Sequence, residues 1–404
     1  PFKKNGGFFQ MKKIIGILAV AATFASSVFA ADFAARAVME GNIAGGNKDK
    51  VTIWSLSEKE QKDADALVVS VNGDNAGAQF QMWYKYDASG SAPLNIRNTN
   101  IWFKPIDMLK VTVGDVSVGT YKEMINWWKV GSGERADAHS PWTWSGYASV
   151  EGPGLSLELT PIAGLWLNAG VTAKPGTNFA TIGKDSFEYA AYGAAAKYTF
   201  ADFPLNAAIS WRDAGKGKEK ILAVGAEYGN HWSDGFYGML NVRMRFEDVK
   251  YEITDKNFVE PGKILQRTWD CGTTLSAIVF DNYFKYSVAG LSIQLRAPVT
   301  IRMVSDMDGK FKASEFGYSD PSWMAYELYV SYPIGSVTTY LDVDNDNAIT
   351  FNDKFVDKVL QMNIKPGVKF NVGACSFDMG VQISLAEGAK SVSWSVPFLA
   401  ALAF

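Results

Sequence analysis

Acidic side chains between residues 342 and 353 have the spacing of a metal-binding loop. Carboxylates stand at positions 1, 3, 5 and 12 of this stretch: Asp342, Asp344, Asp346 and Asp353. Calcium loops place oxygen ligands at these positions. The pattern is incomplete, because Asn347 replaces the loop glycine and Asp353 replaces the final glutamate. The stretch predicts either an extracellular calcium-binding loop or a solvated acidic loop, and calcium is the only cofactor that the sequence suggests.

A second constellation, Asp137-Ala138-His139-Ser140, places an acid, a base and a hydroxyl together. A catalytic triad requires such groups to converge within hydrogen-bond reach, which neighbours on one loop do not provide by themselves. The Gly-Lys-Gly-Lys tract at 215–218 lacks the spacing and the strand-to-helix context of a phosphate-binding loop. The chain has two histidines, His139 and His231, too few for a multi-histidine metal site. We therefore expect no enzymatic activity.

The bulk composition excludes further classes of protein. The 404 residues carry a formal net charge of −3, which argues against a nucleic-acid partner because such binding usually requires a basic patch. After residue 30, no apolar run of about 18 residues occurs, so no transmembrane helix is indicated.

The N-terminal region has the parts of a secretory signal peptide. Met11, Lys12 and Lys13 precede an apolar stretch, and small residues lead to Ala30. A basic start, a short apolar centre and a small-residue end are the features of such a leader. We expect this segment to be a signal peptide that is cleaved after Ala30. The alternative is a buried N-terminal helix. Residues 1–10 are then an upstream or non-native extension, 11–30 the signal peptide and 31–404 a single domain.

Apolar and polar residues alternate along many segments of the remaining chain. Between residues 236 and 247, every second position is apolar or glycine, and the other positions include Asn241, Arg243 and Glu247. Similar alternation starts at Leu165, Leu291 and Phe377. Such segments suit tilted strands of about 9–11 residues that cross a bilayer. A soluble sandwich also alternates, but with strands of about five or six residues.

Short turns and long polar stretches follow each other between these segments. Turn sequences occur at 104–107, 160–163, 200–204, 288–290, 332–335 and 372–374, and longer polar stretches at 44–64, 119–145, 174–186, 248–267, 304–320 and 344–356. We predict an all-β fold, a closed antiparallel transmembrane β-barrel with short periplasmic turns and long extracellular loops. Tracing the chain gives roughly 18 strands, or about 16 because the alternation at 44–75 is weak. Cys271 and Cys375 then fall on opposite rims, so we expect no disulfide between them.

The C-terminal segment ends on an alternating apolar face that includes Trp394, Phe398, Leu402 and Phe404. This face resembles the assembly signal of bacterial outer-membrane barrels, although a buried terminal strand of a soluble sheet would alternate too. ADFAARAVMEG (31–41) and VPFLAALAF (396–404) also resemble the ends of spirochaete (treponemal-type) outer-membrane barrel proteins. Between the two ends the resemblance is architectural. It implies a porin-like or surface-exposed barrel in the bacterial outer membrane, and the terminal strand implies the barrel-assembly machinery as a partner.

A barrel of roughly 16–18 strands is too wide for side chains to fill, so it holds water unless loops or a plug occupy it. The polar faces of the predicted strands supply the candidate pore-lining residues: Gln81, Lys85, Arg243, Arg245, Glu247, Arg296, Arg302, Lys365 and Lys369. The four arginines form either a selectivity region, since charged side chains set ion preference, or an ordinary solvated wall. The 119–145 stretch is our candidate for a loop folded into the lumen. Its tryptophans either stack on sugars, pack internally or form an interfacial belt: Trp127, Trp128, Trp142 and Trp144.

Two functional hypotheses follow. The first is a porin for passive diffusion of small hydrophilic solutes, with outer-membrane lipid as its surroundings and a homotrimer as a common assembly. The second is a surface-exposed adhesin or structural barrel with a plugged lumen. The long aromatic-rich loops favour neither hypothesis.

Overall fold

One antiparallel sheet accounts for the described part of the chain. The computed structural model describes residues 32–56, 66–84, 94–119, 150–173, 190–215, 220–260, 263–303, 311–313, 323–345, 349–350, 362–386 and 391–403. These ranges contain 23 strands, all in the same sheet. None of the described residues belongs to a helix long and apolar enough to cross a membrane.

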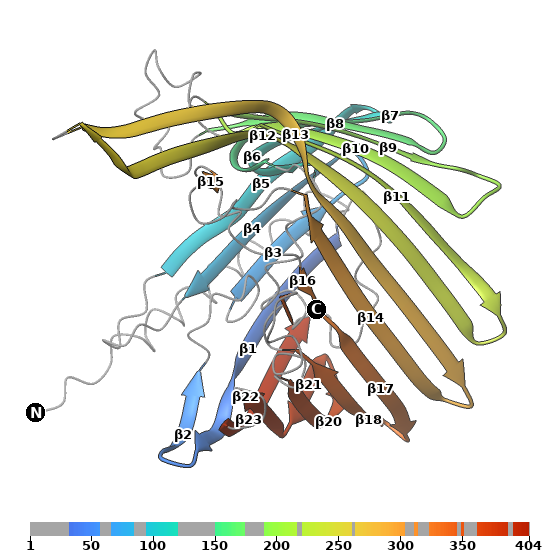
Figure 1. Ribbon diagram of the computed structural model, residues 1–404. Coiled ribbons are helices and arrows are strands. Elements are labelled where there is room, and N and C mark those ends of the chain that lie inside the picture. Colours follow the sequence, from blue (N-terminus) through green and yellow to red (C-terminus); the bar gives the residue numbers. More distant parts are fainter. Residues whose placement is uncertain are drawn as a thin grey trace, which may run out of the picture.

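The strands follow one another around the wall in chain order (Figure 1). The first group is β1 (Asp32–Asn47), β2 (Val51–Leu56), β3 (Ala66–Asn72), β4 (Ala76–Tyr84), β5 (Leu94–Ile106), β6 (Leu109–Val118), β7 (Val150–Ile162), β8 (Leu165–Thr172), β9 (Ala191–Thr199), β10 (Leu205–Asp213), β11 (Lys220–Ser233) and β12 (Phe236–Glu260). The second group is β13 (Lys263–Val288), β14 (Leu291–Arg302), β15 (Phe311–Ala313), β16 (Trp323–Met324), β17 (Glu327–Ile334), β18 (Val337–Asp344), β19 (Ile349–Thr350), β20 (Asn363–Val372), β21 (Cys375–Gly380), β22 (Gln382–Ala386) and β23 (Ser391–Ala403).

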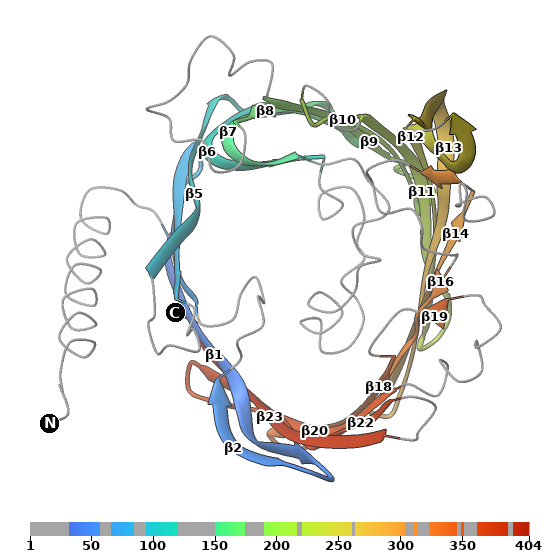
Figure 2. The ribbon, with the colours of Figure 1, turned by 60° about the vertical axis from the view of Figure 1, so that its left-hand side comes forward.

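The sheet closes on itself, because β23 pairs with β1 between Arg36↔Ala403 and Asn47↔Ser393. Figure 2 shows the resulting ring. Some consecutive strands are two parts of the same wall-crossing strand, which we call a stave. These pairs are β2 with β3, β16 with β17, β18 with β19, and β21 with β22. When each such pair is counted once and the short β15 is left aside, the 23 described strands form 18 staves. The predicted all-β fold and its approximate strand number are confirmed.

Tight turns join the staves at one rim. Two-residue turns occur at 107–108, 163–164, 234–235, 289–290, 335–336 and 373–374, and most of them coincide with the predicted turn sequences. Both described ends of the chain reach this rim, since Asp32 pairs with Asn72 beside the 73–75 turn and Ala403 pairs with Arg36. The other rim carries the longer connections, among them residues 119–149 between β6 and β7.

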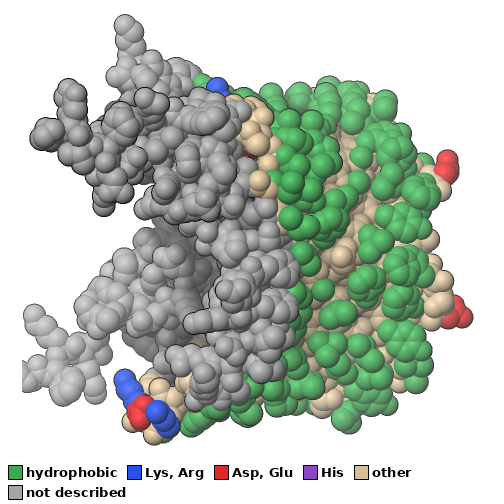
Figure 3. All heavy atoms as spheres, in the orientation of Figure 1, with side chains coloured by type: hydrophobic (Ala, Val, Ile, Leu, Met, Phe, Trp, Pro, Cys, Tyr) green, Lys and Arg blue, Asp and Glu red, His purple; other side chains and the backbone are tan. Residues whose placement is uncertain are grey.

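The two faces of the wall differ in polarity. On β12, Leu240 and Met244 are 43% and 39% exposed on the outside, whereas Asn241 and Arg243 on the inside are each 3% exposed. Apolar side chains dominate the part of the outer wall seen in Figure 3. Water-soluble proteins bury most of their apolar residues, so this inverted pattern suits a wall that faces lipid. The alternation predicted for 236–247 is confirmed.

Part of the predicted loop structure is wrong. Residues 248–267 were expected to form a loop, but β12 continues to Glu260 and β13 begins at Lys263, so they form a long two-stranded ribbon. The stretch 44–64 likewise contains the end of β1 and all of β2. A ribbon that projects from the sheet needs no apolar face toward lipid, and its polar composition is therefore indistinguishable from that of a loop.

A charge on the lipid-facing side of β12 should destabilise the barrel. We expect Leu240→Arg to lower the free energy of unfolding by about 2–4 kcal/mol, the cost of arginine near the bilayer midplane. Urea unfolding of protein reconstituted in phosphatidylcholine vesicles measures this change. Val288→Arg, at the turn rim and 46% exposed, is the matched control and should cost roughly 0–1 kcal/mol. Equal effects at both positions would contradict the assignment of the outer face.

Candidate functional site: the inner wall of the barrel

A buried ion-pair cluster joins β12, β13 and β14 on the inner face. Arg296 Nε and Nη2 donate to the two carboxylate oxygens of Asp281 at 3.0 and 2.7 Å, and Arg243 Nη2 lies 3.4 Å from the same carboxylate. All three side chains are 2–3% exposed. Strand alternation brings them to one face, and the two-pronged contact fixes the plane of the Arg296 guanidinium. Arg243 and Arg296 were predicted from sequence, and Asp281, which links them, was missed.

Arg245 and Glu247, two positions apart on β12, form a neighbouring pair. Arg245 Nε donates to Glu247, whose side chain is 3% exposed. The Ser276 hydroxyl on β13 donates to the backbone oxygen of Arg245 and holds this part of the strand. Four predicted pore-lining residues, Arg243, Arg245, Glu247 and Arg296, therefore lie in two adjacent ion-paired groups, in which the carboxylates of Asp281 and Glu247 pair with the three arginines.

A second cluster combines aromatic rings and lysines on β17, β18, β20 and β21. The Tyr329 and Tyr340 rings stack with centroids 5.4 Å apart. Lys365 and Lys369 both pair with Asp378, at 3.3 and 3.4 Å, and both ammonium groups lie over the Tyr340 ring. The Tyr340 hydroxyl donates to the same carboxylate. Lys369 is the accessible member, with 32% of its side chain exposed.

Glycine provides the space for this arrangement. Gly367 pairs with Tyr340 on one side and with Gly380 on the other. A Cβ atom at Gly367 would overlap the Tyr340 ring, and one at Gly380 would press on the Lys365 side chain. The ring therefore lies across the bare backbone of β20 and reaches Asp378 on β21.

The first three residues of the predicted calcium loop, 342–344, belong to strand β18. Asp342 is fully buried on the inner face of β18, opposite Tyr329 and Lys365 in the two neighbouring strands. Asp344 accepts a hydrogen bond from the Asn363 side chain at 2.9 Å. In the part of the chain that the structure describes, no group of three or more His, Cys, Asp or Glu residues is placed to hold a metal ion. Asp346 and Asp353 lie outside the described residues.

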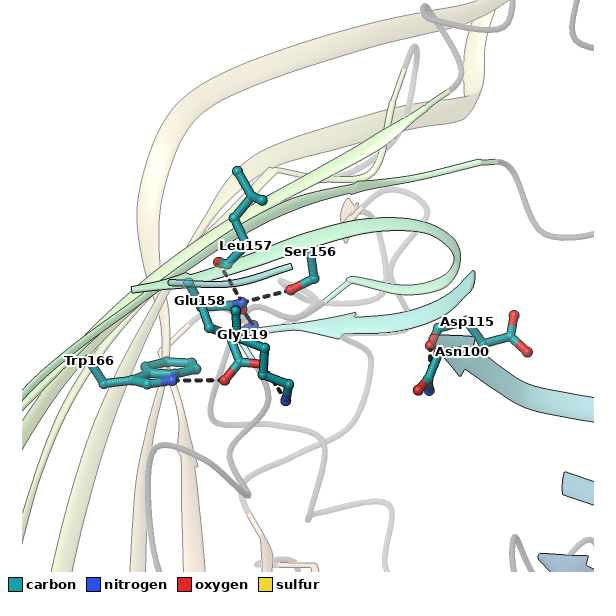
Figure 4. A network of polar contacts seen from close by, with 9 residues as sticks. Asn100, Asp115, Gly119, Ser156, Leu157, Glu158 and Trp166 are labelled. Atoms are coloured by element: carbon teal, nitrogen blue, oxygen red, sulfur yellow. Dashed lines mark hydrogen bonds and ion pairs between the residues drawn. The ribbon is translucent and has the colours of Figure 1, made fainter. Parts of the chain in front are cut away.

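A third cluster lines the opposite wall near the turn rim. Lys110 on β6 pairs directly with Glu158 on β7, and its Nζ lies 3.0 Å from the carboxylate. The Trp166 indole on β8 donates to the other carboxylate oxygen at 3.3 Å (Figure 4). Lys110 Nζ also lies 5.6 Å from the centre of the Trp102 ring on β5. The alternation that starts at Leu165 puts Trp166 on the opposite face of its strand from Leu165, but it does not predict the cluster, because the alternation of single strands does not reveal the register between them.

The loop-side ends of β6 and β7 fold inward over the wall instead of continuing it. Val118 and Val150 pair with each other and are 0% and 4% exposed. Cβ atoms added at Gly170 on β8 and Gly193 on β9 would overlap these valine side chains. The end of the β6–β7 hairpin therefore packs against these two glycines. Figure 2 shows the hairpin end inside the ring.

Hydrogen bonds and a glycine hinge hold the inward fold. The Gly119 amide donates to Asn168 Oδ1 at 2.9 Å, and Asn168 donates to the Ser156 hydroxyl at 2.8 Å (Figure 4). The bend occurs where Gly114 pairs with Gly154. Gly114 has φ +116°, and a side chain at either position would overlap backbone of the adjacent strand. Gly119 and Val150, the described residues on either side of 120–149, thus both lie on the inside of the barrel.

The remaining predicted residues are distributed as follows. Gln81 is 1% exposed, on the inner face of β4. Trp394 is 38% exposed and pairs with Ile383, and Phe398 and Leu402 share its face of β23, the strand that closes the barrel. Cys375 is a free thiol beside the 373–374 turn. Outside the described residues or side chains lie Lys85, Arg302, Phe404, residues 137–140 and the tryptophans of 119–145.

Comparison with solved structures identifies the architecture. OpdL from Pseudomonas aeruginosa is similar over 93% of this chain and 98% of its own, with 10% identity and a TM-score of 0.50. OccK2 (OpdF) and the vanillate complex of OpdK, both from P. aeruginosa, have the same coverage and TM-score, with 9% and 8% identity. No protein-family model and no curated protein matches the sequence. The chain has the fold of an outer-membrane β-barrel of the porin type.

Removal of the Asp281 carboxylate, which Arg243 and Arg296 share, should destabilise the folded barrel. We expect Asp281→Asn to lower the free energy of unfolding by about 3–5 kcal/mol, because two guanidinium groups stay buried without their counter-ion. Denaturant unfolding in detergent micelles measures the change. The control is Asp213→Asn, which breaks a pair with the 57% exposed Lys220 and should cost roughly 0–1 kcal/mol. A small effect at Asp281 would mean that water already solvates the arginines.

The glycine hinge gives a separate prediction. We expect Gly114→Val to cost on the order of 1–3 kcal/mol through backbone strain and to speed hydrogen exchange at the Gly119 amide, which loses its bond to Asn168. Mass spectrometry of deuterium uptake measures the exchange. Gly335→Asn is the control, since φ there is +62° with open space around the position and asparagine tolerates this conformation. Unchanged protection of Gly119 in Gly114→Val would contradict the role of the hinge.

Proposed function

We propose that the protein is an outer-membrane channel for passive diffusion of small hydrophilic solutes. The observation that carries the proposal is the polarity of the closed wall on β12, β13 and β14. Charged side chains there are buried on the inner face, among them Arg243, Asp281 and Arg296, whereas Leu240, Met244 and Leu295 are exposed on the outer face. A barrel of 18 staves is too wide for its own side chains to fill. The remaining interior is lined by groups that hydrogen-bond to water and solutes.

We infer that the inward-folded end of the β6–β7 hairpin narrows this interior. It occupies lumen space over β8 and β9, and it supports the prediction that the adjoining stretch 119–145 folds into the lumen. Of the two alternatives for the arginines, we favour a minor role in ion selectivity, because Asp281 offsets one of the two charges of Arg243 and Arg296 and all three side chains are almost completely buried. Lys369 is a better candidate for the selectivity-determining charge, since its side chain is the accessible part of the second cluster.

A surface interaction protein is the second candidate function. It is favoured by the β12–β13 ribbon, which continues beyond the stretch that pairs with β11 and ends at Glu260↔Lys263. In Figure 1 this ribbon projects from the upper left of the barrel. Such a projection supplies a surface for partners whether or not solutes cross the lumen.

The remaining proposals concern export and assembly. We propose that residues 11–30 direct export, that the β23 face with Trp394, Phe398, Leu402 and Phe404 is read by the barrel-assembly machinery, and that outer-membrane lipid surrounds the wall. A homotrimer, a spirochaete origin and calcium binding by the 342–353 stretch are further proposals from the sequence. Calorimetric titration of the folded protein with calcium tests the last of these, and the absence of heat would remove it.

The channel proposal predicts ion conduction. The purified protein should form discrete conductance steps in planar bilayers and should allow liposomes to swell in sugars up to a size limit. Lys369→Glu changes the charge in the lumen by about two elementary units and should shift the reversal potential toward cation selectivity. Lys48→Glu, in the exposed turn between β1 and β2, is the control and should leave selectivity unchanged.

Two results would contradict these expectations. A folded barrel that neither conducts nor swells liposomes would favour the interaction protein. Conduction with identical selectivity in wild type and Lys369→Glu would remove Lys369 from the conducting path while leaving the channel intact.

A further inference from the structure

We propose that the third cluster of the inner wall is a binding patch for a short neutral saccharide. The patch consists of Trp102, Lys110, Glu158 and Trp166, one residue from each of the adjacent strands β5, β6, β7 and β8. The inference rests on the proposed function, because a solute must be able to enter the lumen, and it adds a substrate class to that function.

The position of the patch suits a solute at the mouth of the barrel. Lys110 and Trp166 follow the 107–108 and 163–164 turns by two residues, so the patch lies just inside the turn rim. Neighbouring strands are about 4.8 Å apart, and three such spacings separate β5 from β8. The two indoles therefore bracket roughly 14 Å of wall, which is the length of a short oligosaccharide.

Trp102 provides a flat surface. A Cβ atom at Gly77 on β4 would overlap the Trp102 indole, so the ring lies against the bare backbone of the wall. The residue is only partly buried, and a ring held against the wall directs its other face inward, where the ammonium groups of Lys104 and Lys110 lie 5.8 and 5.6 Å from the ring centre and border the surface left for a ligand. Aromatic faces of this kind bind the apolar C–H face of a ring-shaped ligand, while a few placed polar groups fix its orientation.

Lys110, Glu158 and the Trp166 indole supply the polar groups. They form one hydrogen-bonded network, in which Glu158 accepts from both partners. The Lys110 and Glu158 side chains are 35% and 26% exposed, so their remaining donor and acceptor positions are open to a ligand. Adjacent donors and acceptors match the vicinal hydroxyl groups of a sugar. Because the ammonium and the carboxylate neutralise each other, the pair favours a neutral ligand over an anion.

The other inner-wall clusters lack this combination. Arg243, Asp281 and Arg296 are almost completely buried, and so are the stacked rings of Tyr329 and Tyr340. Among the described clusters, the patch on β5–β8 is the one that presents both an indole and an accessible ion pair to the interior. Lys104, whose Nζ lies 5.8 Å from the centre of the Trp102 ring, places one further positive charge at the margin of the patch, outside the neutral Lys110–Glu158 pair.

Calorimetric titration of the purified, detergent-solubilised protein with maltose tests the proposal. We expect saturable binding to the wild type and a loss of affinity of about tenfold in Trp102→Ala, the factor expected when one aromatic contact is removed. Glu158→Gln should also weaken binding. Trp232→Ala is the matched control: this tryptophan packs near the same rim against Phe236 and Phe284, and its loss should leave maltose affinity unchanged. Heat-modifiable migration on gels verifies that each variant is folded.

The outcomes separate the two proposals. A wild type that conducts ions but shows no maltose heat, or equal affinity in wild type, Trp102→Ala and Glu158→Gln, would overturn the saccharide patch and leave the channel standing. Much tighter binding of gluconate than of maltose would overturn the preference for a neutral ligand. Maltose binding without conductance would support the patch and overturn the channel.

Discussion

The constraint on which the rest of the structure depends is that backbone hydrogen bonds must be completed in hydrocarbon. Water is absent there, so each unpaired amide or carbonyl costs several kcal/mol. The pairing of β1 with β23 meets this constraint by removing the free edges of the sheet. Closure in turn separates two environments along every strand. The alternation of side chains, the inverted polarity and the existence of an interior all follow from that separation.

On the inner face of the barrel, the constraint concerns side chains, because buried charged groups need partners of opposite charge. The structure solves it with shared carboxylates: Asp281 serves two arginines, Asp378 serves two lysines and a tyrosine, and Glu158 serves a lysine and an indole. Each network spans at least two strands, so it also fixes their register. The networks differ in exposure, and this difference separates structural ion pairs from groups that remain available to a solute.

Glycine has a consistent role in shaping the interior. Gly77 and Gly367 leave space for aromatic rings to lie against the wall, and Gly170 and Gly193 receive the inward-folded hairpin end. The paired Gly114 and Gly154 allow that hairpin to leave the wall at all. The shape of the lumen therefore depends on missing side chains as much as on the residues that project into it.

The sequence alone determined the fold class, the approximate number of staves, the turn rim and the outward face of strands such as β12, because all of these depend on period-two alternation and local turn residues. It also identified Arg243, Arg296, Lys365 and Lys369 as inward-facing candidates. Only the tertiary structure decided that Asp281 and Asp378 pair with them, that 248–267 is a ribbon, and that Trp102 and Trp166 flank Lys110 and Glu158. The reason is register: alternation assigns a side chain to a face, whereas contacts between strands depend on how far each strand slides along its neighbour, and that offset is set by closure of the whole ring.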